Sequence, residues 1–208
     1  GRAFAGLDRA DGVRRSLDQI ESLADTTYQA GLLMLAVALE LRYHGNRDDA
    51  IAAASRAVRW FEVSRGQIPA DPDHRVVHGA ALYHAEQWDQ SEQVLGQARE
   101  ASQLQIDALG YLGLLTARRG DRQRAEEYSA QLERIGLEGL DSRAKTWVYR
   151  ARIAAVLGNR AVAVSQLKRA FDEKLKYMPS PELHTQYRFD FEIIEDYAPY
   201  QELMRPKG

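Results

Sequence analysis

The sequence contains no cysteine. This absence excludes a disulfide framework, cysteine-ligated zinc, iron–sulfur clusters and thiol catalysis. It suits reducing and oxidising compartments alike, so it leaves the compartment open, and we favour a cytoplasmic location. An excess of one charge is also lacking, because 28 Lys and Arg face 30 Asp and Glu. A domain that binds nucleic acid normally shows a strong basic excess, so we expect no direct nucleic-acid partner.

Long hydrophobic runs are missing as well. The longest apolar run, residues 32–39, is far shorter than the ~20 residues that span a bilayer, so we expect a buried helix there and no membrane insertion. The N-terminus has no basic region followed by an apolar run and a cleavage site, so we expect no signal peptide. Because residue 1 is Gly rather than Met, we expect the chain to be a piece of a longer protein.

What the chain does have is enough apolar material for a core. It has 208 residues, of which 45% are hydrophobic, with only 15 Gly and 6 Pro. Apolar residues recur at spacings of three and four, and no useful stretch alternates with period two. This pattern predicts an all-α fold.

The chain contains an internal repeat. Turns are predicted around Gly45, Glu86, Gly120 and Gly158, at spacings of 41, 34 and 38 residues. A small or apolar residue lies seven positions before each turn residue and a small residue five positions after it. These pairs are Ala38 and Ala50, Gly79 and Ser91, Gly113 and Ala125, and Ala151 and Ala163. Two antiparallel helices approach closely only where side chains are short, so each unit is predicted to be a helical hairpin.

The pattern resembles the tetratricopeptide repeat (TPR), a 34-residue helix-turn-helix unit. The third unit matches the family at Leu109, Leu112-Gly113, Gly120-Asp121, Ala125 and Leu132, and the fourth has Trp147 in the Trp position of the family. In the first two units Met34 and Arg75 stand where Trp is usual. The resemblance implies a right-handed α-solenoid.

We therefore expect one continuous solenoid domain in three parts. Residues 1–24 are a remnant of a preceding repeat, residues 25–178 form four hairpins, and residues 179–208 form a C-terminal capping segment. A solenoid end needs a cap, and the side chains expected to cover the fourth hairpin are Phe189, Phe191, Ile194, Tyr200 and Leu203. Before them, Pro179-Ser180-Pro181 is predicted to end one helix and start another, with Ser180 as N-cap.

The last residues carry a second resemblance. Residues 191–208 are similar to the ending of many large bacterial signalling proteins, in which a TPR array follows a serine/threonine kinase, a nucleotide cyclase or a DNA-binding domain. The sequence departs from that ending at Ile193 and Ala198, where proline is usual. The resemblance implies a natural C-terminus and an effector domain upstream of this chain.

Motifs for catalysis are absent from the sequence. It has no Gly-x-Ser-x-Gly, no P-loop, no Gly-x-Gly-x-x-Gly and no His-Glu-x-x-His, so we expect neither enzyme activity nor a cofactor. His74 and His78 lie four residues apart near Asp71 and Asp73, which is one arrangement that binds metal. The alternative is a pair of packed histidines between helices, and we favour it over a metal site.

In TPR arrays the first helix of each hairpin lines a concave face, so the resemblance implies a set of groove residues. The candidate partner-binding residues are Arg42, Tyr43, Asp73, Tyr83, His84, Asp107, Arg118, Lys145 and Arg152. The Lys and Asn with which some TPRs grip a chaperone carboxylate are replaced by Leu35 and Leu39, so that clamp is not implied here. Arg118, Lys145 and Arg152 are instead expected to hold an acidic group of a partner.

These observations predict a scaffold that binds a peptide or protein partner through its concave face. The alternative is a regulatory or self-association module that controls an absent effector domain, with a homodimer as one possible state. The apolar end of the groove, at Leu32, Leu35 and Leu39, is either open or covered by a helix of residues 9–24. The loop of residues 66–73 is a second candidate contact surface.

Overall fold

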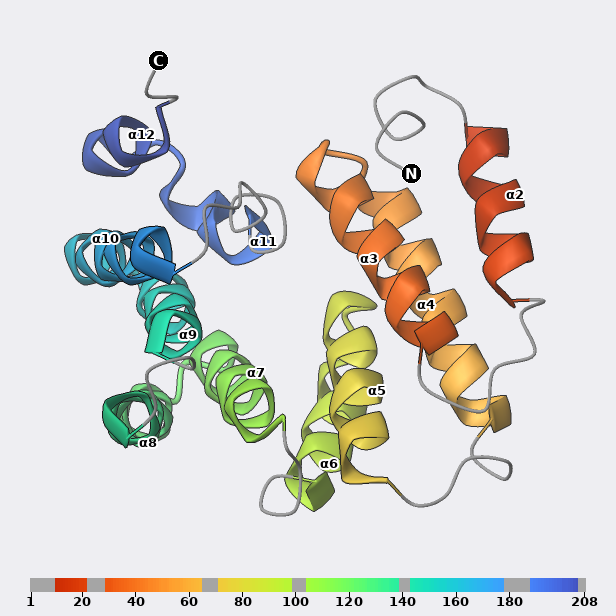
Figure 1. Cartoon of the computed structure of the whole chain (residues 1–208), viewed down its shortest axis with the longest axis horizontal. Helices are drawn as coiled ribbons and strands as arrows, with labels where there is room; N and C mark the ends of the chain where they lie inside the picture. Colours follow the sequence, from red (N-terminus) through yellow and green to blue (C-terminus); the bar gives the residue numbers. More distant parts are fainter. Residues whose placement is uncertain are drawn as a thin grey trace. The chain divides into compact units, whose positions relative to one another are not determined.

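The structure is a computed structural model that describes residues 10–21, 29–64, 71–98, 104–138, 143–177 and 188–205. Within these ranges all regular secondary structure is helical, which confirms the predicted all-α class (Figure 1). The elements are α2 (Ala10–Glu21), α3 (Gln29–Tyr43), α4 (Arg47–Ser64), α5 (Pro72–His84), α6 (Trp88–Ala98), α7 (Gln105–Arg118), α8 (Arg122–Glu138), α9 (Arg143–Val156), α10 (Arg160–Tyr177), α11 (Arg188–Phe191), the 3₁₀ helix η2 (Glu192–Ile194) and α12 (Ala198–Met204).

The chain forms two compact units, residues 1–105 and residues 106–208. The first unit contains α2 to α6, and the second contains nearly all of α7 and the elements after it. Each unit is described by itself below. The single continuous domain expected from the repeats stays a prediction.

The four predicted turns are confirmed. Gly45, Gly120 and Gly158 have φ values of 81°, 78° and 77°, and Glu86 has a φ of 60°. Left-handed backbone is accessible to glycine without steric cost, which explains three of these residues. The N–H of Gly120 donates to the Ala117 carbonyl at 3.0 Å, and equivalent bonds close the turns at Gly45 and Gly158. The turns therefore end α3, α5, α7 and α9 and start the helices that follow.

Small residues bring the paired helices together, as the repeat pattern predicted. A Cβ atom at Gly79 on α5 would lie 2.5 Å from Leu95 Cγ on α6. The Ser91 hydroxyl donates to the Gly79 carbonyl at 2.7 Å. In the other pairs Ala50, Ala125 and Ala163 are all buried. Short side chains at these positions thus set the close spacing within each hairpin.

The start of α5 has a complete N-cap. The Asp71 carboxylate accepts a hydrogen bond from the Asp73 N–H at 2.9 Å, and Pro72 occupies the first turn. The remainder of the predicted 66–73 loop lies outside the described residues. The predicted helix end and N-cap at residues 179–181 also lie outside them.

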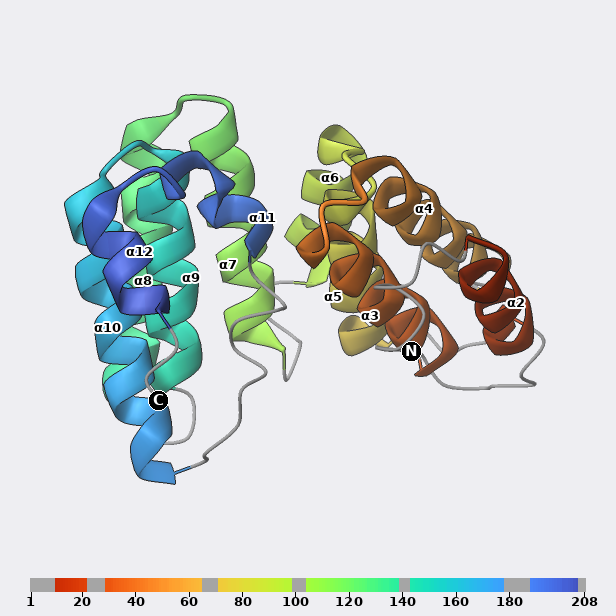
Figure 2. The same cartoon turned by 90° about the horizontal axis from the view of Figure 1, so that it is seen from above.

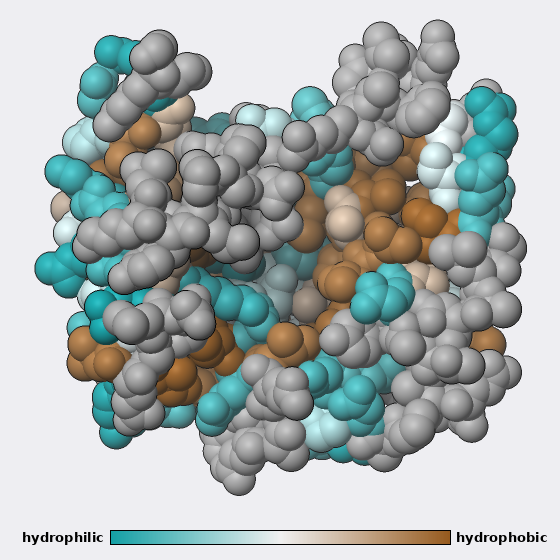
Figure 3. Space-filling model, in the orientation of Figure 1, coloured by the Kyte–Doolittle hydropathy of each residue, from teal (hydrophilic) through white to brown (hydrophobic). Residues whose placement is uncertain are grey.

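The run at residues 32–39 is buried on only one side of α3. Met34 and Leu35 are buried, but Leu32 is 39% and Leu33 is 46% exposed, so the expectation of a buried helix is confirmed for one side of α3 only. Helix α2 packs against α3, with Leu17 buried and Asp18 paired with Arg56 of α4 at 2.6 Å. It leaves part of α3 uncovered, and hydrophobic surface lies over this helix in Figure 3.

The C-terminal segment, residues 188–205, packs against the fourth hairpin. Helix α11 contacts α9 and α12 contacts α10, as Figures 1 and 2 show. Phe191, Ile194 and Tyr200 share a buried cluster with residues of α9 and α10, and Leu203 packs against it. The residues of α9 and α10 in this cluster are Ala151, Ala154, Ala155, Ala163 and Leu167.

Candidate interaction surface

In the second unit, two of the predicted groove residues contact each other. Asp107 on α7 forms an ion pair with Lys145 on α9, and its other carboxylate oxygen accepts a hydrogen bond from the Tyr149 hydroxyl at 2.8 Å. Asp107 precedes Gly120 by 13 residues, and Lys145 precedes Gly158 by the same number. The pair is therefore a cross-hairpin contact between equivalent positions. The Lys145 side chain remains 40% exposed, so this pair lies at the surface.

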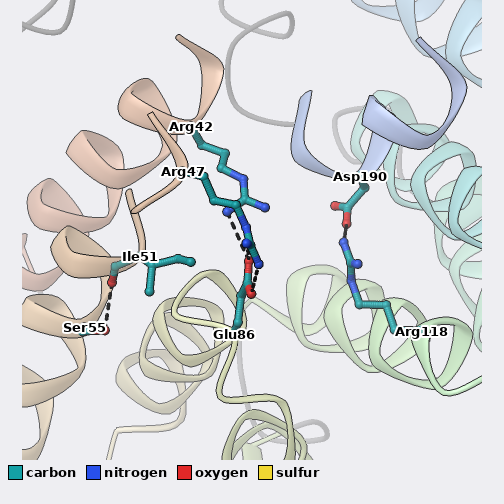
Figure 4. Close-up of polar contacts among 7 residues, drawn as sticks. All are labelled: Arg42, Arg47, Ile51, Ser55, Glu86, Arg118 and Asp190. Carbon is teal, nitrogen blue, oxygen red and sulfur yellow. Dashed lines mark hydrogen bonds and ion pairs between the residues drawn. The ribbon is translucent and has the colours of Figure 1, made fainter. Parts of the chain in front are cut away.

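Two further predicted residues, Arg118 and Arg152, converge on a carboxylate that the sequence analysis did not select. Arg118 Nη2 lies 2.6 Å from Asp190 Oδ1, and Figure 4 draws the two side chains pointing toward each other. Arg152 Nε donates to Asp190 Oδ2 at 2.8 Å, and its Nη2 lies 2.7 Å from the same oxygen. The side chains of Arg152 and Asp190 are both 0% exposed. Each oxygen of Asp190 is thus held by a different arginine.

Aromatic rings surround this arginine pair, Arg118 and Arg152. The Arg118 guanidinium lies 4.4 Å from the centre of the Phe189 ring. The Arg152 guanidinium lies 4.8 Å from the Tyr149 ring and 5.2 Å from the Tyr111 ring. Cation–π contacts of this kind stabilise guanidinium groups that have lost much of their water. The rings therefore fix both arginines in position and help to offset the cost of burying them.

In the first unit, a second carboxylate binds two arginines. Glu86, at the turn between α5 and α6, pairs with Arg42 of α3 at 3.2 Å and with Arg47 of α4 at 2.6 Å (Figure 4). Arg42 is a predicted groove residue and is buried. It contacts the neighbouring hairpin rather than open solvent.

The remaining predicted groove residues of the first unit differ in exposure. Tyr83 and His84 are buried and their rings meet edge to face at 5.3 Å. Tyr43 is half-buried, as is Asp73, whose carboxylate accepts a hydrogen bond from the Leu104 N–H at 3.4 Å. Tyr83 and Arg152 have no exposed surface, so a partner reaches them only if neighbouring side chains move. A binding role for the nine predicted residues stays a prediction.

The two histidines considered for metal binding pack on a phenylalanine. The Phe61 ring meets His74 edge to face at 4.9 Å and stacks on His78 at 5.4 Å. Both histidines are buried. Within the described ranges, no three His, Asp or Glu side chains gather as they would around a metal ion.

The sequence analysis did not select Asp190 and Glu86, the two carboxylates that each pair with two arginines. A signal for Asp190 was present in the repeat register, because Asp196 lies 38 residues after Gly158, the spacing of the preceding pair of turns. Asp190 precedes Asp196 by six residues, as Arg152 precedes Gly158. Extending the repeat by one period would have placed the two side chains at equivalent positions.

The described helices and the comparisons leave the function to be inferred from these contacts. None of the helices that the structure describes has both the length and the hydrophobicity needed to cross a bilayer. No protein-family model matches the chain, and no curated protein or solved structure is significantly similar to it.

Proposed function

We propose that the chain is a protein-interaction module of the TPR class, in which the hairpins stack as a right-handed solenoid and bind a peptide or protein partner. The observation that carries this proposal is the repeated hairpin, in which small residues lie at the same offsets before and after each turn residue. Such arrays present the first helix of each hairpin as an extended binding face. Charged side chains on those helices supply specificity for a partner of complementary charge.

The surface that supports binding best in the second unit is the row formed by Asp107 and Lys145. Lys145 is the more exposed of the pair, and it provides a cation that an acidic side chain of a partner can approach. Its contact with Asp107 orients the ammonium group without burying it. An extended peptide with an acidic residue is therefore the ligand that this row favours.

A displayed library of 15-residue peptides panned against the full chain tests the proposal. We expect enrichment of peptides that contain Asp or Glu, with dissociation constants measured by fluorescence anisotropy. Lys145→Gln should weaken them about fivefold, since it removes one charge-assisted contact. Lys168→Gln on α10, an exposed lysine on a second helix, is the matched control and should bind as the unmodified chain does. Absence of any enriched peptide, or equal loss in both variants, would refute the proposal.

A second candidate is a regulatory module that controls an effector domain upstream. It is favoured by the docked C-terminal segment, whose Asp190 occupies the arginine pair. To test this role, the chain is fused to the effector domain that the role proposes. The activity of that domain is then compared between the fusion that retains Asp190 and the fusion that carries Asp190→Ala. Equal activity of the two fusions, with both folded, would count against regulation through this contact.

A further inference from the structure

We propose that Arg118 and Arg152 form a binding site for the carboxylate of an acidic partner segment, and that Asp190 occupies this site in cis. Partner binding there then competes with docking of the C-terminal segment. The inference deepens the proposed function by naming one of its binding sites, and it rests on that function for the partner. The site itself is argued from contacts within the second unit alone.

The first step is that the arginine pair requires an anion. Arg152 is fully buried and Arg118 is nearly so, with 14% of its side chain exposed. Two cations in such surroundings repel each other, and their desolvation is costly without an opposite charge. One carboxylate satisfies both, with an oxygen for each arginine. After Asp190 is counted, the cluster still carries a net positive charge, so it favours anions over neutral groups.

The second step is that helices outside the C-terminal segment build the site. Arg118 is on α7 and Arg152 is on α9, and these helices are joined by the Asp107–Lys145 pair and by the Tyr149–Asp107 hydrogen bond. The Tyr111 and Tyr149 rings pack edge to face at 5.6 Å beside the Arg152 guanidinium. None of these contacts involves Asp190. The site formed by Arg118 and Arg152 is therefore preorganised, which lowers the entropic cost of binding a ligand.

The third step is that the C-terminal segment has the character of a docked ligand. Its helices contain four, three and seven residues, and helices this short are not stable alone in water. Their order depends on contacts made with α7, α9 and α10. Phe189 supplies a ring for Arg118, Asp190 supplies the carboxylate, and Phe191 enters the apolar cluster. The ligand class is thus an aromatic-acidic-aromatic peptide.

Small-molecule rescue tests the chemistry of the site in the full chain. We expect Asp190→Ala to lower the Tm by about 10 °C, because it leaves two buried arginines without their carboxylate. Sodium acetate at 100 mM should then restore about 4 °C for a Kd of about 10 mM, and sodium chloride at equal ionic strength should not. The unmodified chain should respond equally to both salts. An equal response of Asp190→Ala to acetate and chloride would overturn the site.

Competition by a peptide tests the exchange. A fluorescent peptide of residues 188–205 is titrated into the full chain and into Asp190→Ala, beside the same peptide carrying Asp190→Asn. We expect the Asp peptide to bind about tenfold more tightly than the Asn peptide, and to bind Asp190→Ala about tenfold more tightly than the unmodified chain. Should Asp190→Ala fail to fold, the two peptides are compared on the unmodified chain by hydrogen exchange of residues 189–204. Equal effects of the two peptides would overturn the proposal.

The two arms separate this inference from the proposed function. Acetate rescue requires no partner, so it can succeed while the peptide library yields nothing, and the proposed function would then fail alone. Conversely, library peptides can bind through Lys145 while Asp190→Ala shows no preference for acetate, and the arginine site would then fail alone.

Discussion

Gly110 shows how one missing side chain positions the helices of the second unit. A Cβ atom at this position of α7 would lie 2.2 Å from Cδ1 of the Tyr149 ring on α9. Tyr149 is 1% exposed, and its hydroxyl is held by Asp107 at 2.8 Å. The ring therefore has little room to move away. Glycine at residue 110 is needed for the close approach that also joins Asp107 to Lys145.

Gly110→Ala is expected to lower the free energy of unfolding by about 2 kcal/mol, because it overpacks a buried contact. Urea denaturation measures the effect. Gly96→Ala on α6 is the matched control, since a Cβ atom there meets nothing within 4 Å. That change should stabilise the chain by up to about 1 kcal/mol through helix propensity. Opposite signs for the two alanines are the expected result, and destabilisation by both would contradict it.

The type of residue that makes a contact determines whether the contact can be predicted from the sequence. Small residues such as Gly79 and Ser91 carry a steric requirement that a fixed spacing reveals. The repeat register does mark Asp190 as equivalent to Arg152 one period later. Register alone does not name a partner for a charged side chain, because Arg152 can pair with a solvent ion, a ligand or a carboxylate far along the chain. The candidate residues were therefore placed on the correct helices, but their partners, Glu86 and Asp190, were not foreseen.

At the scale of the elements, three of the turns make the same kind of contact with the next turn along the chain. An arginine two residues after a turn glycine reaches the next turn along the chain in both units. Arg47 binds Glu86, Arg122 donates to the Leu157 carbonyl at 3.0 Å, and Arg160 donates to Asp196 at 3.2 Å. These contacts are exposed, so each contributes little to stability. Their value is in setting the register of one hairpin against the next element.

Gly120→Ala tests the conformational requirement of such a turn. No atom lies within 4 Å of a Cβ atom at residue 120, so the φ of 78° is the only source of cost. We expect a loss of about 1 kcal/mol in the free energy of unfolding, measured in urea. Gly120→Asn should lose less, because Asn tolerates this backbone region better than Ala. A larger loss for Asn than for Ala would show that a contact of the added side chain, rather than backbone strain, determines the loss of stability.

At the scale of the whole molecule, the sequence repeat and the structure divide the chain differently. The repeat runs through all four hairpins and predicted one domain, whereas the contacts form two compact units with a boundary after residue 105. One sequence feature marks the hairpin before this boundary. Its turn is Glu86-Gln87-Trp88, so Trp88 stands where the other three hairpins have an arginine. The repeat spacing treats all four hairpins as equivalent, so the single domain that it predicts takes no account of this difference.

The two units are expected to open separately, because each contains its own buried side chains. Gly110→Ala in the second unit should speed amide hydrogen exchange about 30-fold in α7 to α10 and leave α3 to α6 unchanged. Gly31→Ala in the first unit is the reciprocal change, since a Cβ atom there would lie 2.3 Å from Cζ of buried Phe61. It should speed exchange in α3 to α6 only.

Exchange measured by mass spectrometry on both variants separates the two views of the molecule. A substitution destabilises every residue that unfolds in the same cooperative step, so the extent of the faster exchange marks the limits of that step. Faster exchange confined to the substituted unit in both variants would establish two cooperative units. Faster exchange throughout the chain in either variant would instead establish the single continuous domain that the repeat spacing predicted. The hairpins on both sides of residue 105 would then unfold in one cooperative step.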